Sequence, residues 1–100
     1  MSTNIETVAC GVLRAYPVKH AAFFGSAARG DMGENSDVDI LVEFLSNTRG
    51  LEFFGLRVDL EEALGRTVDL ITFNALTKSR LEFRKHVEQE TRLIYEYKDA

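Results

Sequence analysis

The sequence has almost no cysteine or proline, no long apolar run and no excess of basic residues. The single cysteine, Cys10, cannot form an internal disulfide, which is typical of proteins that fold in a reducing compartment. One proline and seven glycines leave little material for a flexible linker between domains. We therefore expect residues 1–100 to form a single domain.

Membrane and nucleic-acid functions are disfavoured on similar grounds. No apolar stretch approaches the length of a membrane span, and the first residues lack the basic and apolar pattern of a secretion signal. The net charge is −4 and the pI is near 5.1, so no basic field attracts nucleic acid or an anionic membrane. The sequence thus predicts a cytoplasmic protein without direct nucleic-acid binding.

Three segments carry apolar residues at helical spacing. The first covers residues 3–15 and is ended by Pro17, because the residue before a proline is pushed out of the helical region. The second covers Leu51–Leu64 and is closed by Gly65 as a C-cap. A last helix is predicted from about Thr77, with Tyr95 beside a narrow apolar stripe of Phe83, Val87, Thr91 and Ile94.

Three other segments have the composition of strands. They are rich in apolar and β-branched residues and cover residues 18–24, 37–44 and 67–73. A short helical turn, Ala27–Gly30, follows the first of them. Strands that alternate with helices over this length predict an α/β (α+β) domain, with a small mixed sheet of three to four strands flanked by helices.

Two aspartates interrupt the apolar run of the second predicted strand. Asp37 and Asp39 stand two positions apart, so their side chains point to the same face of a strand. Val38 and Ile40 point to the opposite face and anchor the core. Carboxylates in such positions can bind divalent cations, whose hard oxygen chemistry favours Asp over His or Cys. The pattern therefore predicts a metal site on one face of this strand.

A third aspartate, Asp69, lies inside the apolar run of the last predicted strand. If the two strands are neighbours, three carboxylates meet on one face, where they repel one another unless a metal neutralises them. The alternative is an ion pair between Asp69 and Arg66 or Arg29. Taken alone, this alternative is competitive, but together with Asp37 and Asp39 the metal site is the better interpretation.

Gly25 and Ser26 supply the second half of the predicted site. Glycine lets the backbone approach a ligand closely, and a following helical turn presents N–H groups to an anion. A Gly-Ser pair is weak evidence alone, because most such pairs are plain turns. Its position shortly before the acid pair suits a polyphosphate, which the amides and the hydroxyl would hold while metals bridge the phosphates.

Other polar and aromatic residues have simpler explanations. Three acids are explained by a turn or a solvated strand end: Asp31, Glu34 and Glu43. His20 and His86 have no partners at ligand spacing, so zinc is disfavoured, and the charged segment Lys78–Arg92 is most simply a solvated helix face. Four phenylalanines are more typical of core or subunit contact than of base stacking: Phe23, Phe24, Phe53 and Phe54.

The stretch GSAARGDMGENSDVDILV, residues 25–42, closely resembles the signature of the polymerase-β-like nucleotidyltransferase superfamily. That signature reads Gly-Ser-x-Ala-Arg-Gly, a short spacer, then Ser-Asp-x-Asp and apolar residues. The chain looks most like the smallest branch, the minimal nucleotidyltransferases (MNT). The resemblance extends to Gly-Arg-x-Val-Asp-Leu at residues 65–70 and implies a polymerase-β palm-like core.

The resemblance implies roles for the carboxylates. Asp37 and Asp39 match the metal-binding pair of the signature. Asp69 matches a third carboxylate, which in catalytic members also holds metal and helps to activate the attacking hydroxyl. Two Mg²⁺ ions, with Mn²⁺ as a substitute, are implied as cofactors.

The first half of the signature implies a nucleotide site. Gly25 and Ser26 match the pair that holds the triphosphate of ATP or another NTP. Arg29 matches the motif arginine, which either touches phosphate or braces the loop; the sequence leaves these two roles open.

The implied activity is transfer of a nucleoside monophosphate, AMP from ATP, to a hydroxyl group. Minimal nucleotidyltransferases commonly pair with a helical HEPN toxin and act as its antitoxin, some by attaching AMP to a tyrosine. Two alternatives stay open: inhibition of the partner by occlusion alone, and transfer to a small molecule such as an aminoglycoside. Exposed aromatic residues on the helices suit a homodimer or a heterocomplex.

Overall fold

The computed structural model describes residues 5–30, 33, 37–45, 50–73, 75 and 91–98. The elements in chain order are α1 (Ile5–Leu13), β1 (Val18–Phe24), α2 (Ser26–Arg29), β2 (Val38–Phe44), α3 (Gly50–Leu64), β3 (Val68–Thr72) and β4 (Arg92–Glu96). Within these ranges, no helix combines the length and the apolar character that crossing a bilayer requires.

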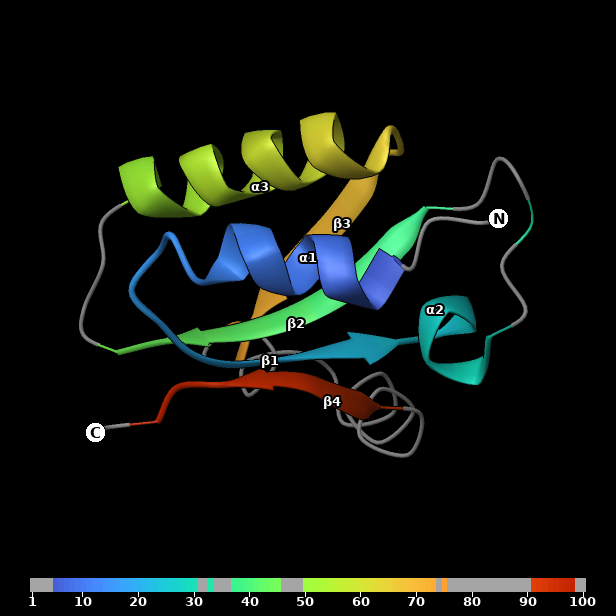
Figure 1. The fold of residues 1–100 in the computed structure, drawn as a ribbon, viewed down its shortest axis with the longest axis horizontal. Coiled ribbons are helices and arrows are strands. Elements are labelled where there is room, and N and C mark those ends of the chain that lie inside the picture. The colour runs from blue at the N-terminus through green and yellow to red at the C-terminus, as the bar shows by residue number, and fades with distance from the viewer. Residues whose placement is uncertain are drawn as a thin grey trace.

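Within the described residues, the strands form one sheet of four strands in the order β3-β2-β1-β4 (Figure 1). β1 pairs antiparallel with both β2 and β4, whereas β2 and β3 are parallel. A parallel pair needs a crossover connection, and α3 provides it. The predicted fold, a small mixed sheet flanked by helices, is therefore confirmed.

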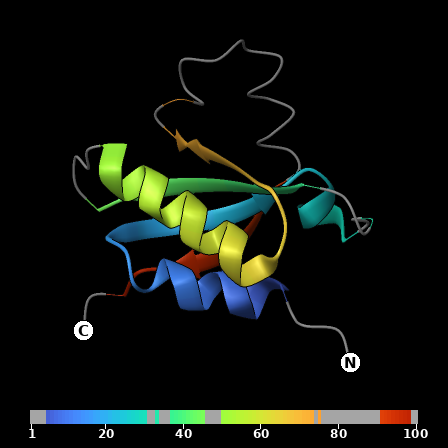
Figure 2. The same ribbon diagram turned by 90° about the horizontal axis from the view of Figure 1, so that it is seen from above.

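Both long helices, α1 and α3, lie on the same side of the sheet (Figures 1 and 2). The sheet face that they cover contributes these buried apolar residues to the core: Ala21, Phe23, Val38, Ile40, Val42, Val68 and Leu70. Leu56 and Leu60 of α3 and Leu13 of α1 complete this core and are fully buried. Burial of this apolar surface is the main stabilising term of the fold.

Local signals explain where the two long helices end. α1 ends four residues before Pro17, as the proline predicts. Gly65 follows α3 with a φ of 66°, and its N–H donates to the Glu61 carbonyl at 2.9 Å. This left-handed conformation is the helix C-cap that the glycine predicted.

The prediction of a helix at the end of the chain is wrong for residues 92–96. These residues form β4, an edge strand that pairs with β1. The helical spacing of Thr91 and Ile94 is only a short pattern, whereas the open edge of β1 offers backbone hydrogen bonds to a segment with β-prone residues such as Ile94 and Tyr95. The remainder of that helix, including Phe83, His86 and Val87, lies outside the described residues, as do Asp31 and Glu34 of the predicted turn.

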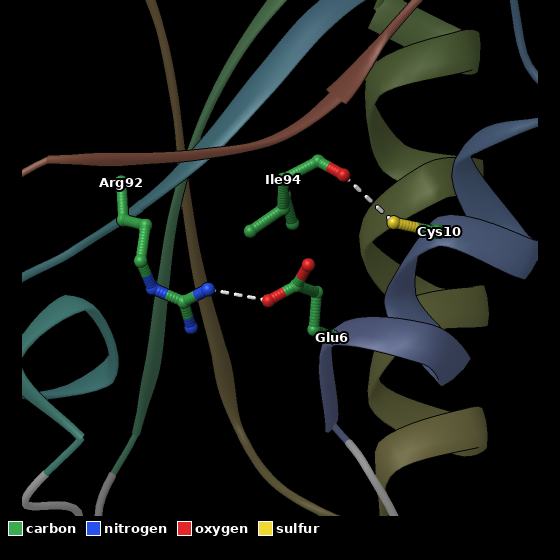
Figure 3. Close-up of polar contacts among 4 residues, drawn as sticks. All are labelled: Glu6, Cys10, Arg92 and Ile94. Atoms are coloured by element: carbon green, nitrogen blue, oxygen red, sulfur yellow. Dashed lines mark hydrogen bonds and ion pairs between the residues drawn. The ribbon is translucent and has the colours of Figure 1, made fainter.

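Side chains hold β4 against α1 (Figure 3). The Arg92 guanidinium pairs with the Glu6 carboxylate and lies 5.4 Å from the centre of the Phe23 ring. The Cys10 thiol donates a hydrogen bond to the Ile94 carbonyl, with 2.9 Å between the atoms. Burial raises the pKa of the Cys10 thiol, in keeping with its role as a protonated donor.

Candidate active site

The parallel pairing of β2 and β3 brings two of the three aspartates side by side. Asp39 and Asp69 are register partners, so their side chains leave the same sheet face from strands about 4.8 Å apart. Asp37 lies two residues before Asp39 and shares this face by strand alternation. The face is opposite to the one that α1 and α3 cover. The three carboxylates therefore lie near one end of the sheet face that α1 and α3 do not cover.

The three carboxylates differ in exposure, and the charges of Asp37 and Asp69 repel the charge of Asp39. Asp39 is half-buried, whereas Asp37 and Asp69 are exposed. The pKa of Asp39 is raised above its ordinary value, first by burial and then by the negative charges of Asp69 and Asp37. Ionised Asp39 is thus unfavourable in its surroundings, which is the electrostatic condition that a bound cation relieves.

The aspartates form an open cluster. In the part of the chain that the structure describes, no three carboxylate, thiol or imidazole groups converge closely enough to enclose a metal ion. An all-oxygen set with open positions suits Mg²⁺ or Mn²⁺, which take further ligands from water and from substrate phosphates. It suits structural zinc poorly, because zinc prefers a closed set rich in nitrogen and sulfur.

Gly25 lies against the Asp39 carboxylate. Its φ of 64° and ψ of −141° belong to a region that is open mainly to glycine. A Cβ at this position would lie 2.7 Å from Asp39 Oδ2, which is well inside contact distance. Glycine therefore allows the chain leaving β1 to pass directly beside this carboxylate.

The short helix α2 begins at the same point. The Ala28 and Arg29 N–H groups donate to the Gly25 carbonyl at 3.1 and 3.2 Å, and Gly30 turns the chain with a φ of 77°. Ser26, the first residue of α2, is half-buried next to Gly25, whereas Arg29 is exposed at the other end. Of the predicted phosphate-holding residues, Gly25 thus adjoins Asp39 and Ser26 follows it, whereas Arg29 is the last residue of α2.

Arg66 and Glu43, which the sequence also placed near the aspartates, have other contacts. Arg66, one alternative partner for Asp69, donates from Nη1 to the Gly33 carbonyl at 2.8 Å. Glu43 lies 3.3 Å from His20 Nε2 and 3.9 Å from Lys19 Nζ, at the far end of β2 from the aspartates. Glu43 therefore has a local role in pairing the strands.

Sequence reasoning missed a cavity of about 340 Å³ on the same sheet face as the aspartates. His20, Ala22, Leu41 and Phe73 contribute to its wall, and the His20 and Phe73 rings meet edge to face at 4.7 Å. The signal available in the sequence was parity, since Leu41 lies two residues from Asp39. Parity could place Leu41 on this face, but the partners on β1 depend on strand pairing.

A palm-like sheet with aspartates beside a Gly-Ser turn is the arrangement of nucleotidyl-transferring enzymes. Residues 5–94 match the nucleotidyltransferase domain family, and the chain belongs to this family. The protein is therefore a nucleotidyltransferase, and the resemblance found in residues 25–42 is confirmed.

Curated relatives give the same class. The protein MJ0435 of Methanocaldococcus jannaschii, named as a candidate protein adenylyltransferase, is 45% identical over 65 residues, which are 65% of this chain and 70% of that protein. The protein adenylyltransferase MntA of Thermococcus cleftensis is 43% identical over 61 residues, which are 61% of this chain and 62% of that protein.

Solved structures share the fold. A structure described as a minimal nucleotidyltransferase matches with a TM-score of 0.70 and 28% identity, over 87% of this chain and 86% of that one. A chain of a toxin–antitoxin complex with AMP-PNP gives a TM-score of 0.73 at 23% identity, over 92% and 73% of the two chains. A complex of tri-AMPylated Shewanella oneidensis HEPN toxin with its MNT antitoxin gives 0.67 at 19% identity, over 93% and 71%.

Proposed function

We propose that this nucleotidyltransferase transfers AMP from ATP to a tyrosine hydroxyl of a HEPN-type partner protein and thereby acts as an antitoxin. The observation that carries the proposal is the contact of Gly25 with Asp39, with Asp69 directly beside it on β3. The names of the relatives, protein adenylyltransferases, support the donor and the reaction. The AMPylated HEPN toxin bound to an MNT protein of the same fold supports the acceptor.

The three aspartates are the residues that would hold two Mg²⁺ ions. When bound, a divalent ion here neutralises phosphate charge and favours deprotonation of the attacking hydroxyl. Asp39 is central, because it lies next to Gly25 on one side and Asp69 on the other. The raised pKa of Asp39 supports a cation at this point, since its ionised form needs a positive partner.

Gly25 and Ser26 would hold the triphosphate, and Asp69 would face the acceptor. The glycine backbone passes close to Asp39, so phosphate oxygens held there lie next to the carboxylates. The acceptor oxygen forms a new bond to the α-phosphorus, the bond to pyrophosphate breaks, and the hydroxyl proton leaves towards Asp69 or solvent. Asp69 suits this position because it is exposed and lies on an edge strand of the described sheet.

Intact-mass spectrometry of the HEPN partner tests the proposal. The partner is incubated with the purified chain and Mg-ATP, and we expect its mass to rise by whole AMP groups, with one pyrophosphate released per group. The Asp39→Asn variant is expected to leave the mass unchanged. An unmodified partner with the wild-type chain, under conditions where the two proteins bind each other, would refute transfer to this acceptor.

Occlusion without catalysis is the second candidate, and the open carboxylate cluster is the observation that favours it. The two functions differ in what the Asp39→Ala variant does in a toxicity assay. If the variant binds the toxin but no longer neutralises it, modification is the mechanism. If the variant neutralises as well as the wild type, the partner is inhibited by contact alone.

A further inference from the structure

The cavity beside Leu41, which we name the Leu41 cavity, continues from the aspartates along β2. Its volume of about 340 Å³ lies within the range of about 300–1,000 Å³ that small-molecule sites occupy. Leu41 lies two residues from Asp39, roughly 7 Å along the strand. His20, at the other end of the cavity, is the register partner of Glu43 and thus lies roughly 13 Å along the sheet from Asp39. The cavity therefore begins near this carboxylate and leads away from it.

The geometry of nucleotidyl transfer favours an acceptor on the side of this cavity. The attacking and leaving oxygens of a displacement at phosphorus lie in line, on opposite sides of the phosphorus atom. β1 leads directly into α2 at one end of the sheet (Figure 1), and its last residue, Phe24, is the register partner of Asp39. Gly25 therefore lies on one side of Asp39, whereas the register pair of Ala22 and Leu41 lies on the other. If pyrophosphate leaves towards Gly25, the acceptor hydroxyl arrives from the cavity.

The walls of the Leu41 cavity suit an aromatic ring. Ala22 and Leu41 are buried and form the floor, whereas Leu93 is 57% exposed and forms part of the rim. The His20 and Phe73 rings meet edge to face, with 4.7 Å between their centroids. A third ring can pack against such a pair in the edge-on or offset geometry that aromatic groups prefer. The cavity therefore favours a flat apolar group.

Apolar side chains also connect the cavity with Asp39. Phe24 and Leu41 form a small buried cluster, and Ile71 packs against it. Because Phe24 is the register partner of Asp39, this cluster borders the carboxylate. An acceptor that lies along the cluster needs an apolar body with a hydroxyl group at its tip, and tyrosine has this form. Serine and threonine carry the hydroxyl next to the backbone, whose polar groups the apolar cluster would leave without hydrogen bonds.

Two glutamates near the cavity disfavour a nucleic acid as acceptor. Glu96 lines the cavity and is exposed, and Glu43 Oε1 lies 3.3 Å from His20 Nε2. Lys19 Nζ lies 3.9 Å from Glu43 and offsets part of this negative charge. The phosphates next to the terminal hydroxyl of an RNA would approach Glu96, and like charges across an interface oppose binding. A phenol is neutral and brings no such repulsion.

We propose that the Leu41 cavity is the acceptor pocket and receives the ring of a tyrosine side chain from a partner protein. The phenol oxygen forms the new bond to the α-phosphorus, pyrophosphate leaves towards Gly25, and the phenol proton passes to Asp69 or to solvent. Ala22, Leu41 and Phe73 thus determine which acceptors fit. The pocket has this role only if ATP is the donor and the aspartates are the site of transfer, as the proposed function states.

Nuclear magnetic resonance tests the pocket without any transfer. The isotope-labelled chain, with Mg²⁺ and the non-hydrolysable donor AMP-PNP, is titrated with N-acetyltyrosinamide. We expect the amide shifts to concentrate at Ala22, Leu41 and Leu93, and Ala22→Leu, which fills the cavity, should weaken binding at least about tenfold. N-acetylserinamide is the matched probe and should leave these amides unchanged. Shifts centred elsewhere, equal shifts with both probes, or no shift up to the solubility limit of the tyrosine probe overturn the proposal.

Transfer to the HEPN partner gives a second readout. Ala22→Leu should lower kcat/KM for the partner at least about tenfold and leave the affinity for AMP-PNP, measured by calorimetry, unchanged. Leu93→Ser tests the rim without disturbing the core, because Leu93 is 57% exposed, and it should lower kcat/KM by a smaller factor. Leu51→Ser is the matched control, since Leu51 is 84% exposed on α3, on the other side of the sheet, and its variant should react like the wild type.

The two readouts distinguish a failure of the pocket from a failure of the proposed function. A wild-type chain that binds N-acetyltyrosinamide at Leu41 but leaves the HEPN partner unmodified supports the pocket and refutes that partner as the acceptor. A chain that modifies the partner equally well with Ala22→Leu and with Leu93→Ser supports the function and overturns the pocket. Faster pyrophosphate release with an RNA oligonucleotide or an aminoglycoside than with the partner overturns tyrosine as the occupant.

Discussion

On β2, the side chains that point towards α1 and α3 are Val38, Ile40 and Val42, and all three are fully buried. Those that point the other way begin with Asp39, whose pKa is raised by burial and by neighbouring acids, and they end with Glu43, which lies near His20. The backbone and the hydrogen bonds of the strand serve both sides. The two faces therefore show how a period of two lets one strand present core residues on one side and the residues of the candidate site on the other.

The largest expected effect is a loss of stability on the face of β2 that points towards α1 and α3. Ile40 is fully buried, and Ile40→Ala should lower the free energy of unfolding by about 2–5 kcal/mol, because it removes apolar contacts and leaves a cavity. Urea denaturation followed by circular dichroism measures the loss. Ile71→Ala, at a half-buried position on the other face, is the control and should lose less. Equal losses would mean that both faces stabilise the fold alike.

The adjacent residue should behave in the opposite way. We expect Asp39→Asn to lower the rate of pyrophosphate release by roughly 10²–10³, as removal of a preorganised charged group does, without lowering the free energy of unfolding. Glu43→Gln, on the same face but at the far end of β2, should retain activity. A fully active Asp39→Asn variant would remove Asp39 from the site.

Metal should stabilise the folded chain by binding at the three aspartates. At 100 times its dissociation constant, Mg²⁺ bound only to the folded chain adds about 2.7 kcal/mol, which is a rise of roughly 10–20 °C in the melting temperature of a domain of this size. Differential scanning fluorimetry with and without Mg²⁺ or Mn²⁺ measures it. No shift for the wild type at saturating metal would contradict a metal site at the aspartates.

The Asp39→Asn variant should also change how the stability depends on pH and on metal. Because the pKa of Asp39 is raised in the folded state, its protonated form favours folding in acid, and this contribution is lost as pH rises through the raised pKa. Asp39→Asn should therefore raise the metal-free melting temperature at neutral pH but not at a pH below about 4, the ordinary range of aspartate. The variant should also lose the metal-induced shift.

The two glycines that flank α2, Gly25 and Gly30, test whether the close approach to Asp39 matters. Both Gly25 and Gly30 have positive φ, so an alanine at either position costs about 1–2 kcal/mol of backbone strain. Only at Gly25 does the new Cβ also meet Asp39, at 2.7 Å, whereas at Gly30 nothing lies within 4 Å. Gly25→Ala should lose activity and more stability than Gly30→Ala. Equal effects on both properties would show that the approach to Asp39 is unimportant.

The smallest expected effect concerns a charged contact on the helix side. The Tyr16 hydroxyl donates to Asp59 Oδ2 at 2.5 Å and braces α3 against the end of α1. This hydrogen bond, followed by burial, raises the pKa of Tyr16 to about 12. Tyr16→Phe should cost about 1 kcal/mol. Because the folded pKa is raised, the contribution is complete below pH 10 and is lost as the pH rises through about 12.

Ultraviolet titration of the phenolates checks this last prediction. One of the three tyrosines should titrate near pH 12 in the wild type, and this late step should vanish in Tyr16→Phe but not in Tyr97→Phe. A late step that persists in Tyr16→Phe would belong to another tyrosine.

The parts of the molecule that could be predicted from the sequence depend on local rules. The shared face of Asp37 and Asp39 follows from alternation, and the end of α3 follows from Gly65. Asp69 could be paired with them only on the condition that β2 and β3 are neighbours, and the structure meets that condition. The candidate residues could thus be named from the sequence, while their contacts required the strand order.

The remainder depends on partners that lie far away in the sequence. Residues 92–96 form a strand because the edge of β1 accepts them. The β-prone Ile94 and Tyr95 favour this outcome, but they do not outweigh the helical spacing when the sequence is considered alone. The cavity beside His20 combines residues of several strands. Phe54 was assigned to core or subunit contact, and its 63% exposure could not be derived from a helix that is apolar on two sides.

The register of β2 against β3 also has a consequence for folding. Val38 pairs with Val68 and Asp39 with Asp69, so each strand offers valine and aspartate in the same order. A shift of either strand by one residue would turn its aspartates towards the core and its valines towards water. Burying an unpaired carboxylate is far more costly than losing one apolar contact. The aspartates therefore disfavour a one-residue error in the pairing of β2 with β3, and they do so during folding, before any nucleotide is bound.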